Sequence, residues 1–133
     1  MEQNQKAETY NPEKNPHVGF VGLGRMGANM ARRLSECGYP IASVYDVQES
    51  IASKLAEELD CAHRTRLSDV TDTCDVIFTV VSDDSAQLSI YTDREDNLLQ
   101  GAAKNTLFVN CATVSPHVHQ TIEKHVLEYD AEV

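Results

Sequence analysis

The chain has 133 residues, of which 41% are hydrophobic and 24% charged, and its formal net charge is −10. This length is enough for one domain with a buried core and leaves no room for a second of similar size. Such acidity argues against nucleic acid or an anionic membrane surface as a partner, but it does not exclude a dinucleotide, whose contacts depend on local donors and helix termini.

The N-terminal segment differs in character from the rest of the chain. Residues 1–16 are polar and of mixed charge, without the apolar stretch of a signal peptide or the bias of a transit peptide. We therefore expect a flexible arm ahead of one domain over 17–133. Neither the four cysteines nor the histidines have metal-ligand spacing, so no metal site is expected. Free thiols in a reducing cytoplasm are the corresponding expectation.

Strand-like and helix-like segments alternate from residue 17 onward, which is typical of a parallel sheet covered by helices. In chain order the pattern predicts strand 17–22, helix 25–37, strand 41–45, helix 50–59, strand 61–63, helix 67–74, strand 75–81, helix 84–91, a polar connection 92–100, strand 106–111, helix 116–129 and the start of a sixth strand at 130–133. Met26, Met30 and Leu34 are expected to form the core-facing stripe of the first helix. The predicted fold is α/β, a Rossmann-type doubly wound parallel sheet.

A glycine-rich turn joins the first predicted strand to the first helix. Its residues are Gly22-Leu23-Gly24-Arg25-Met26-Gly27, which match G-x-G-x-x-G. In this motif Gly22 permits a tight turn, Gly24 leaves room for a pyrophosphate, and Gly27 lets the helix pack closely on the strand. The free N–H groups of the helix N-terminus would then face the phosphates. The alternative is a glycine-rich turn that binds nothing.

Asp46 ends the second predicted strand, where an acidic residue decides which dinucleotide fits. Its carboxylate can accept hydrogen bonds from both ribose hydroxyls of NAD, and it would meet the 2′-phosphate of NADP as a like charge. Val47 and Gln48 follow, so no basic residue stands beside it. The sequence thus predicts NAD as the preferred cofactor. The alternative role for Asp46 is a strand-end or helix-capping aspartate.

Four segments resemble the β-hydroxyacid dehydrogenase family, which includes 3-hydroxyisobutyrate dehydrogenase, tartronate semialdehyde reductase and the cofactor domain of 6-phosphogluconate dehydrogenase. Residues 18–31 are similar to its opening signature, residues 78–82 to its fourth-strand segment, and residues 110–116 to its Asp-x-Ser-Thr-x-x-Pro segment. The last of them, residues 130–133, is similar to the Asp-Ala-Pro-Val that precedes the family's Ser-Gly-Gly loop. The resemblance implies that Val81 and Ser82 lie beside the cofactor and Thr113 on the nicotinamide side. The candidate cofactor-binding residues are Gly22, Leu23, Gly24, Arg25, Met26, Gly27, Asp46, Val81, Ser82 and Thr113.

The departures from the family pattern lie partly at the cofactor edge. Ser82 replaces the family's Pro, Ala112 its Ser, Arg33 its frequent Asn, and Glu132 its Pro. The family's Ser-Gly-Gly loop, catalytic lysine and helical domain would all follow Val133. We therefore expect the cofactor domain of an NAD-dependent oxidoreductase of small β-hydroxy acids, without catalytic residues of its own. The alternative is a stand-alone NAD-binding or regulatory module, which the sequence downstream of Val133 would distinguish.

The predicted sheet also suggests a partner. With only four residues available for a sixth strand, the strand at 106–111 would have an exposed edge. Such an edge invites pairing with a second copy of the chain. We therefore expect some self-association.

Overall fold

The computed structural model describes residues 16–102, 106–111, 115–129 and 131. Their core is a five-stranded parallel sheet in the order β4-β3-β2-β5-β6. The strands are β2 (Val18–Val21), β3 (Ile41–Tyr45), β4 (Ala62–His63), β5 (Val76–Thr79) and β6 (Leu107–Asn110). The helices are α1 (Arg25–Glu36), α2 (Glu49–Leu59), α3 (Leu67–Asp72), α4 (Asp84–Thr92), the short 3₁₀ helix η2 (Leu98–Gly101) and α5 (Pro116–Leu127). The predicted Rossmann-type fold is confirmed.

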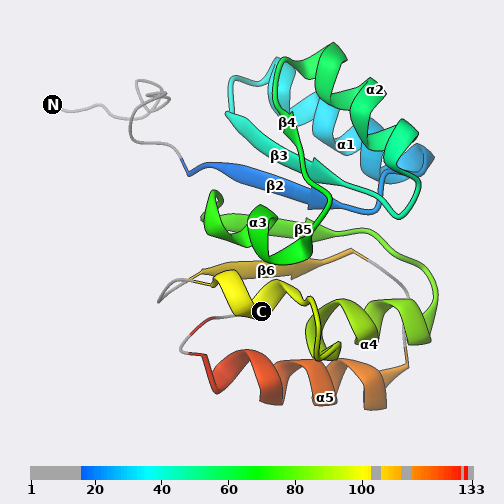
Figure 1. The fold of residues 1–133 in the computed structure, drawn as a ribbon, viewed down its shortest axis with the longest axis vertical. Helices are drawn as coiled ribbons and strands as arrows, with labels where there is room; N and C mark the ends of the chain where they lie inside the picture. Colours follow the sequence, from blue (N-terminus) through cyan, green and yellow to red (C-terminus); the bar gives the residue numbers. More distant parts are fainter. Residues whose placement is uncertain (1–15, 103–105, 112–114, 130, 132–133) are drawn as a thin grey trace, which may run out of the picture.

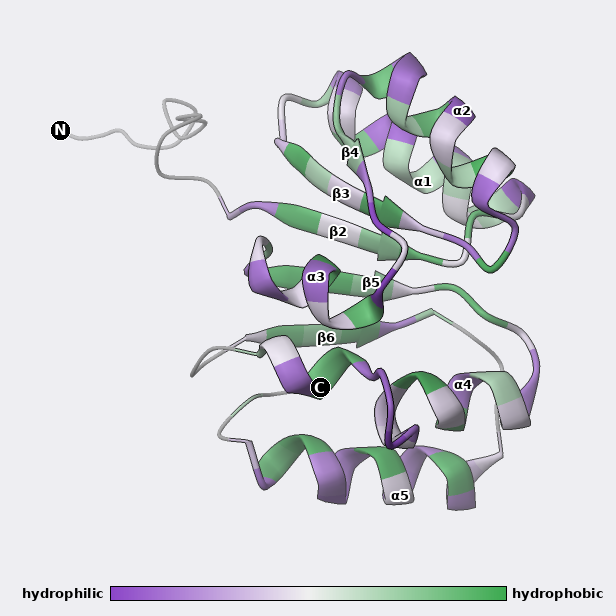
Figure 2. Ribbon diagram, in the orientation of Figure 1, coloured by the Kyte–Doolittle hydropathy of each residue, from purple (hydrophilic) through white to green (hydrophobic). Residues whose placement is uncertain are grey.

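The helices cover the two faces of the sheet (Figure 1). The buried side chains form two separate cores, one on each face. Helices α1 and α2 pack on one face, and α3, α4, η2 and α5 on the other. The alternation of side chains along β2 supplies both cores, since Phe20 points to the first and Val21 to the second. Figure 2 shows the strands as mainly apolar and the helices as apolar on one side and hydrophilic on the other, as expected for a sheet buried on both faces.

Local signals fix most helix ends. Gly38, with a φ of 95°, follows α1 in the left-handed conformation that glycine adopts without penalty. At the start of α4, the Asp83 carboxylate accepts a hydrogen bond from the N–H of Ala86 at 2.9 Å. Ser115 caps α5 in the same way through Val118, with Pro116 at the first helical position.

Two predictions from the sequence were wrong. Met26 is 57% exposed and lies outside the core, whereas Met30 and Leu34 pack against it as predicted, beside the buried Ala28 and Ala31. The fully buried positions of α1 are the small residues Gly27, Ala28 and Ala31, which a count of large apolar side chains does not reveal. The polar connection predicted at 92–100 contains the start of η2, which buries Leu98 and Leu99.

The strand predicted at 75–81 is shorter than expected, since β5 ends at Thr79, although the N–H of Val80 still donates to the carbonyl of Val21 at 2.8 Å. The sixth strand predicted at 130–133 lies outside the described residues except for Ala131, which is buried in the second core. The arm predicted at 1–16 likewise falls outside them apart from Pro16. No helix within the described ranges is long and apolar enough to cross a membrane.

Candidate functional site

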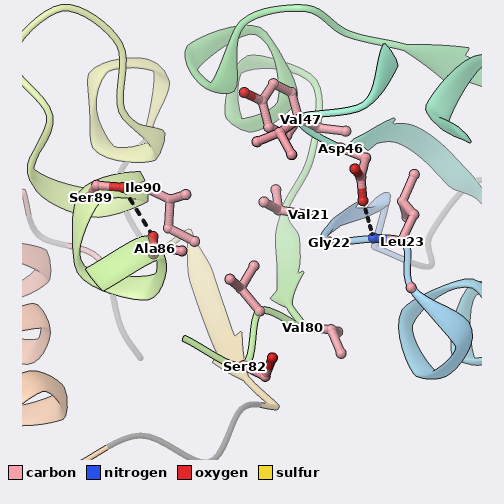
Figure 3. Close-up of a pocket in the computed structure, with 13 residues that line it drawn as sticks. Val21, Gly22, Leu23, Asp46, Val47, Val80, Ser82, Ala86, Ser89 and Ile90 are labelled. Atoms are coloured by element: carbon pink, nitrogen blue, oxygen red, sulfur yellow. Dashed lines mark hydrogen bonds between the residues drawn. The ribbon is translucent and has the colours of Figure 1, made fainter. Parts of the chain in front are cut away.

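A hollow of about 280 Å³ lies where β2, β3 and β5 end. The three strands are neighbours in the sheet. β3 lies on one side of β2 and β5 lies on the other, so the order of the strands reverses at β2. Ligands bind at such a switch point in open α/β sheets. In Figure 3 the glycine-rich turn and Asp46 lie on one side of the hollow and α4 on the other. Its lining residues are Val21, Gly22, Leu23, Gly24, Tyr45, Asp46, Val47, Val80, Val81, Ser82, Ala86, Ser89 and Ile90.

The glycine-rich turn is shaped by two close approaches. Gly22 has a φ of 96°, and a Cβ there would collide with the carbonyl oxygen of Val80. A Cβ on Gly27 would collide with the carbonyl oxygen of Gly22, because α1 packs directly against the turn. Both positions therefore require glycine for packing within the protein itself.

Gly24 is different, since a Cβ there would have no atom within 4 Å. It is the N-cap of α1, has an ordinary φ of −66°, and no side chain caps this helix. A turn that keeps glycine where the protein has free space, ahead of an uncapped helix N-terminus, fits a phosphate group. This part of the hollow can therefore hold a pyrophosphate.

The carboxylate of Asp46 joins the two turns that border the hollow. One oxygen, Oδ2, accepts a hydrogen bond from the N–H of Leu23 at 2.8 Å, and Oδ1 accepts one from the N–H of Gln48 at 2.9 Å (Figure 3 shows the first). Asp46 is half-buried beside Val47, whose side chain is 87% exposed. The carboxylate thus holds the glycine-rich turn and remains at the wall of the hollow.

Tyr45 precedes Asp46 and contributes to the same wall. Burial raises the pKa of its hydroxyl, and the nearby carboxylates of Asp96 and Asp46 raise it further. The hydroxyl therefore stays protonated between two acidic groups. No lysine or arginine is among the described residues that line the hollow, so its electrostatic character is negative on this side.

A buried polar network supports the ends of β5 and β6 below the hollow. Thr79 and Tyr91 both donate to Oδ1 of Asn110, at 2.6 and 2.7 Å, and Nε2 of the fully buried Gln87 donates to Thr79 at 3.0 Å. Burial raises the pKa of the neighbouring Cys111 thiol, which favours its protonated form. The network ties α4 to both strand ends and so fixes the wall that α4 supplies.

The structure brings together most of the predicted site residues. Gly22, Leu23, Gly24, Asp46, Val81 and Ser82 line the hollow. Arg25 and Met26 are exposed on the first turn of α1 without lining it, and Gly27 is buried beneath the turn. Thr113 and Ala112 lie outside the described residues.

The sequence did not indicate the opposite wall, which consists of Ala86, Ser89 and Ile90 on α4. The remaining lining residues that it missed, Val21, Tyr45, Val47 and Val80, adjoin predicted ones. The sequence does contain a signal for these four residues, because residues next to a predicted strand end lie at the same edge of the sheet as that end. For α4 there is no such local signal.

Comparison with known proteins identifies this arrangement. Residues 17–133 match the family model described as the NAD binding domain of 6-phosphogluconate dehydrogenase. The chain is 27% identical over 110 residues to the mitochondrial 3-hydroxyisobutyrate dehydrogenase of Drosophila melanogaster, covering 83% of this chain and 32% of the relative. It is 33% identical over 100 residues to the NAD-dependent L-serine dehydrogenase of Pseudomonas aeruginosa, covering 74% and 32%. The chain thus spans about a third of these relatives.

Solved structures share the fold. The 3-hydroxyisobutyrate dehydrogenase of Mycobacterium tuberculosis, in a structure with L-serine, superimposes with a TM-score of 0.78 at 24% identity, covering 89% of this chain and 38% of that one. Imine reductase structures from Myxococcus stipitatus with the same fold hold NADP⁺ in one case and, in a variant, NAD⁺. Together with the family match over 17–133, the strand order, the glycine-rich turn and Asp46 lead to one conclusion: the chain belongs to the family of the NAD binding domain of 6-phosphogluconate dehydrogenase.

Proposed function

We propose that residues 17–133 form a dinucleotide-binding domain that holds NAD in the hollow at the ends of β2, β3 and β5. The observation that carries the proposal is the glycine-rich turn, open at Gly24 and tied to Asp46 through Leu23. The pyrophosphate lies over Gly24 and the N-terminus of α1, where the backbone of Arg25 and Met26 contributes N–H groups. Asp46 accepts hydrogen bonds from the adenosine ribose hydroxyls.

The other contacts follow from the positions of the remaining site residues. Gly22 and Gly27 keep the turn close to the sheet, and Val81 and Ser82 border the path of the cofactor from β5. Thr113 contacts the nicotinamide side, as the family resemblance implies. When bound, the nicotinamide accepts or donates a hydride. The chain's own residues bind and orient it.

In the complete protein we propose hydride transfer between NAD and a small β-hydroxy acid. Relatives named 3-hydroxyisobutyrate dehydrogenase and L-serine dehydrogenase support this substrate class. The substrate groups and the proton-transferring lysine belong, by the resemblance, to sequence after Val133. Residues 17–133 supply the cofactor half of this reaction.

The preference for NAD over NADP rests on charge. The carboxylate of Asp46 stands at the ribose position, and no lysine or arginine lines the hollow among the described residues. A 2′-phosphate would meet a like charge with no cation to compensate it. We expect NADP(H) to bind at least about tenfold more weakly, which requires only about 1.4 kcal/mol.

Titration calorimetry with NADH and NADPH tests this proposal. The Asp46→Ala variant should lose about 1.5–3 kcal/mol of NADH affinity, the range for hydrogen bonds to charged groups. Glu123→Gln, which neutralises an exposed carboxylate on α5 outside the hollow, is the matched control. Equal affinity for both cofactors would refute the preference, and no binding of either would refute the proposed function.

The proposal also includes a location in the cell and the association of the chain with a second copy of itself. We place the protein in the cytoplasm, in line with its free thiols Cys37, Cys61, Cys74 and Cys111. A fluorescent fusion of the complete protein in its own cells would test this location. We further propose self-association through the edge strand β6, whose test is given at the end of the Discussion.

A further inference from the structure

The cofactor hollow continues into a second one beyond Tyr45. The second hollow, of about 270 Å³, shares four lining residues with the first: Tyr45, Val47, Ser89 and Ile90. The two therefore form one groove, which runs along α4 from the glycine-rich turn to the residues that follow the helix. Its far end is bordered by Leu67 and by three carboxylates, Asp93, Glu95 and Asp96.

The middle of this groove suits a flat, apolar ring. Val47 projects from the end of β3 on one side, and Ile90 lies on α4 on the other (Figure 3). Leu67 adds a further apolar surface. An adenosine whose ribose is held by Asp46 would place its purine between these side chains. The edge of the purine would then face the carboxylates at the far end.

Asp93 is the carboxylate at this end that is both oriented and available. Its backbone N–H donates to the Ser89 carbonyl at 2.9 Å, and its carbonyl accepts from Nδ2 of Asn97 at 2.7 Å. One side-chain oxygen, Oδ1, accepts from the N–H groups of Glu95 and Asp96 at 2.8 and 3.1 Å. The other oxygen, Oδ2, has no hydrogen-bond partner among the described residues.

The other two carboxylates are less suited to recognition. Both oxygens of Asp96 already have protein partners. Oδ1 accepts from the N–H and the hydroxyl of Ser68 at 3.1 and 3.2 Å and lies 3.6 Å from Arg66, and Oδ2 accepts from the N–H of Leu67 at 2.6 Å. Glu95 is exposed, as Asp93 is, but its carboxylate makes no hydrogen bond or ion pair within the described part of the chain, so its orientation is not fixed. Of the three, Asp93 is therefore the carboxylate that is held in place by the protein and still has one oxygen without a hydrogen bond from the described residues.

We propose that Asp93 is a specificity residue that accepts a hydrogen bond from the exocyclic 6-amino group of the cofactor's purine. This inference rests on the proposed function, since it places the adenosine of the dinucleotide in the groove. A carboxylate oxygen only accepts hydrogen bonds, and the 6-amino group is a donor. A site built to bind an N–H group rejects an analogue that lacks it, because the acceptor is left unpaired.

The test is a double-mutant cycle with NAD⁺ and nicotinamide purine dinucleotide, which lacks the 6-amino group, measured by titration calorimetry. The wild-type chain should bind the purine analogue about tenfold more weakly than NAD⁺. Asp93→Asn keeps an oxygen for the N–H groups of Glu95 and Asp96 and places an NH₂ group where Oδ2 was. This variant should therefore bind NAD⁺ more weakly and the analogue as well as the wild type does, so that the tenfold ratio disappears.

Glu123→Gln is again the matched control and should keep the ratio of the wild type. If NAD⁺ binds and the ratio is the same in the wild type and Asp93→Asn, the inference is wrong while the proposed function stands. If neither dinucleotide binds the wild-type chain, the proposed function fails and this inference fails with it. Thermal unfolding of Asp93→Asn confirms that a lost ratio does not come from a lost fold.

Discussion

At the scale of single residues, Asp46 shows how a structural and a binding role coexist in one side chain. Each carboxylate oxygen can accept two hydrogen bonds. In the structure the N–H groups of Leu23 and Gln48 each use one position, which leaves one on each oxygen for a ribose hydroxyl. Asp46 caps neither neighbouring helix, since Gln48 is the N-cap of α2 and Gly24 that of α1, but its strand-end role is compatible with the proposed cofactor role. The protein contacts orient the carboxylate before the ligand arrives, which lowers the entropic cost of binding.

Gly24 and Gly27 allow binding to be separated from folding. Gly24→Ala should leave the free energy of unfolding within about 0.5 kcal/mol of the wild type, because its Cβ meets no protein atom. The same methyl group would occupy the space that we assign to the pyrophosphate, so NADH affinity should fall at least about tenfold. Gly27→Ala should instead destabilise the fold by about 1–3 kcal/mol, since its Cβ collides with the carbonyl of Gly22.

Urea unfolding without cofactor and calorimetric titration with NADH measure the two effects independently. The two variants carry the same chemical change three positions apart, so each serves as the control of the other. Unchanged NADH affinity in a stable Gly24→Ala variant would contradict the assignment of the pyrophosphate to this turn.

At the scale of elements, the segment between α4 and β6 contributes more than its sequence suggests. Asp96 accepts hydrogen bonds from the N–H groups of Leu67 and Ser68, and so caps α3 from a distant part of the chain. Asn97 and Gln100 form a capping box at the start of η2, which in turn packs closely on α3. The polar composition of residues 92–100 therefore does not reveal that this segment is ordered, because the residues it contacts are distant in sequence.

Asp96→Ala should therefore destabilise the fold by about 1–2 kcal/mol, the cost of losing a helix N-cap. The loss comes from the two unsatisfied N–H groups at the start of α3. Glu57→Ala, which removes an exposed carboxylate on α2, provides the comparison and should stay within about 0.5 kcal/mol of the wild type. Urea unfolding is the measurement, and equal stability of the two variants would show that Asp96 is not the cap of α3.

The same contrast between local and distant contacts explains what the sequence could predict. The succession from β2 to β3 was predictable because glycine spacing, helix periodicity and Asp46 are local signals. The wall formed by Ile90 was not, since its position depends on the packing of α4 against β5 and β6 through Gln87 and Tyr91. Met26 was misassigned because periodicity alone does not reveal that Ala28 and Ala31 let α1 approach the sheet.

At the scale of the whole molecule, the chain should bind the cofactor without catalysing a reaction. Purified protein of these 133 residues should show no NAD reduction above background with 3-hydroxyisobutyrate, glycerate or serine. The reason is that the resemblance places the proton-transferring lysine and the substrate loop after Val133. Absorbance at the NADH band measures the rate, with a full-length 3-hydroxyisobutyrate dehydrogenase as the positive control. A robust rate that depends on this protein would show that the chain carries catalytic groups of its own.

The last prediction concerns association of the molecule with itself. Among the described strands β6 lies at the edge of the sheet, hydrogen-bonded to β5 on one side only. Phe108 points into the core, so what the edge offers is backbone N–H and C=O groups flanked by the half-buried Leu107 and Val109. The net charge of −10 opposes the approach of two copies.

This repulsion acts over only about 10 Å at 0.1 M salt and over less as salt is added. Association through β6 should therefore increase with ionic strength, the reverse of what a dimer held by opposite charges would do. Light scattering across a salt series measures it. Val109→Lys places a charge beside the edge and should reduce association at every salt concentration, whereas an exposed substitution on the opposite side of the sheet, Glu57→Lys, should not. A monomer at all salt concentrations would mean that the edge of β6 is not available to a second copy.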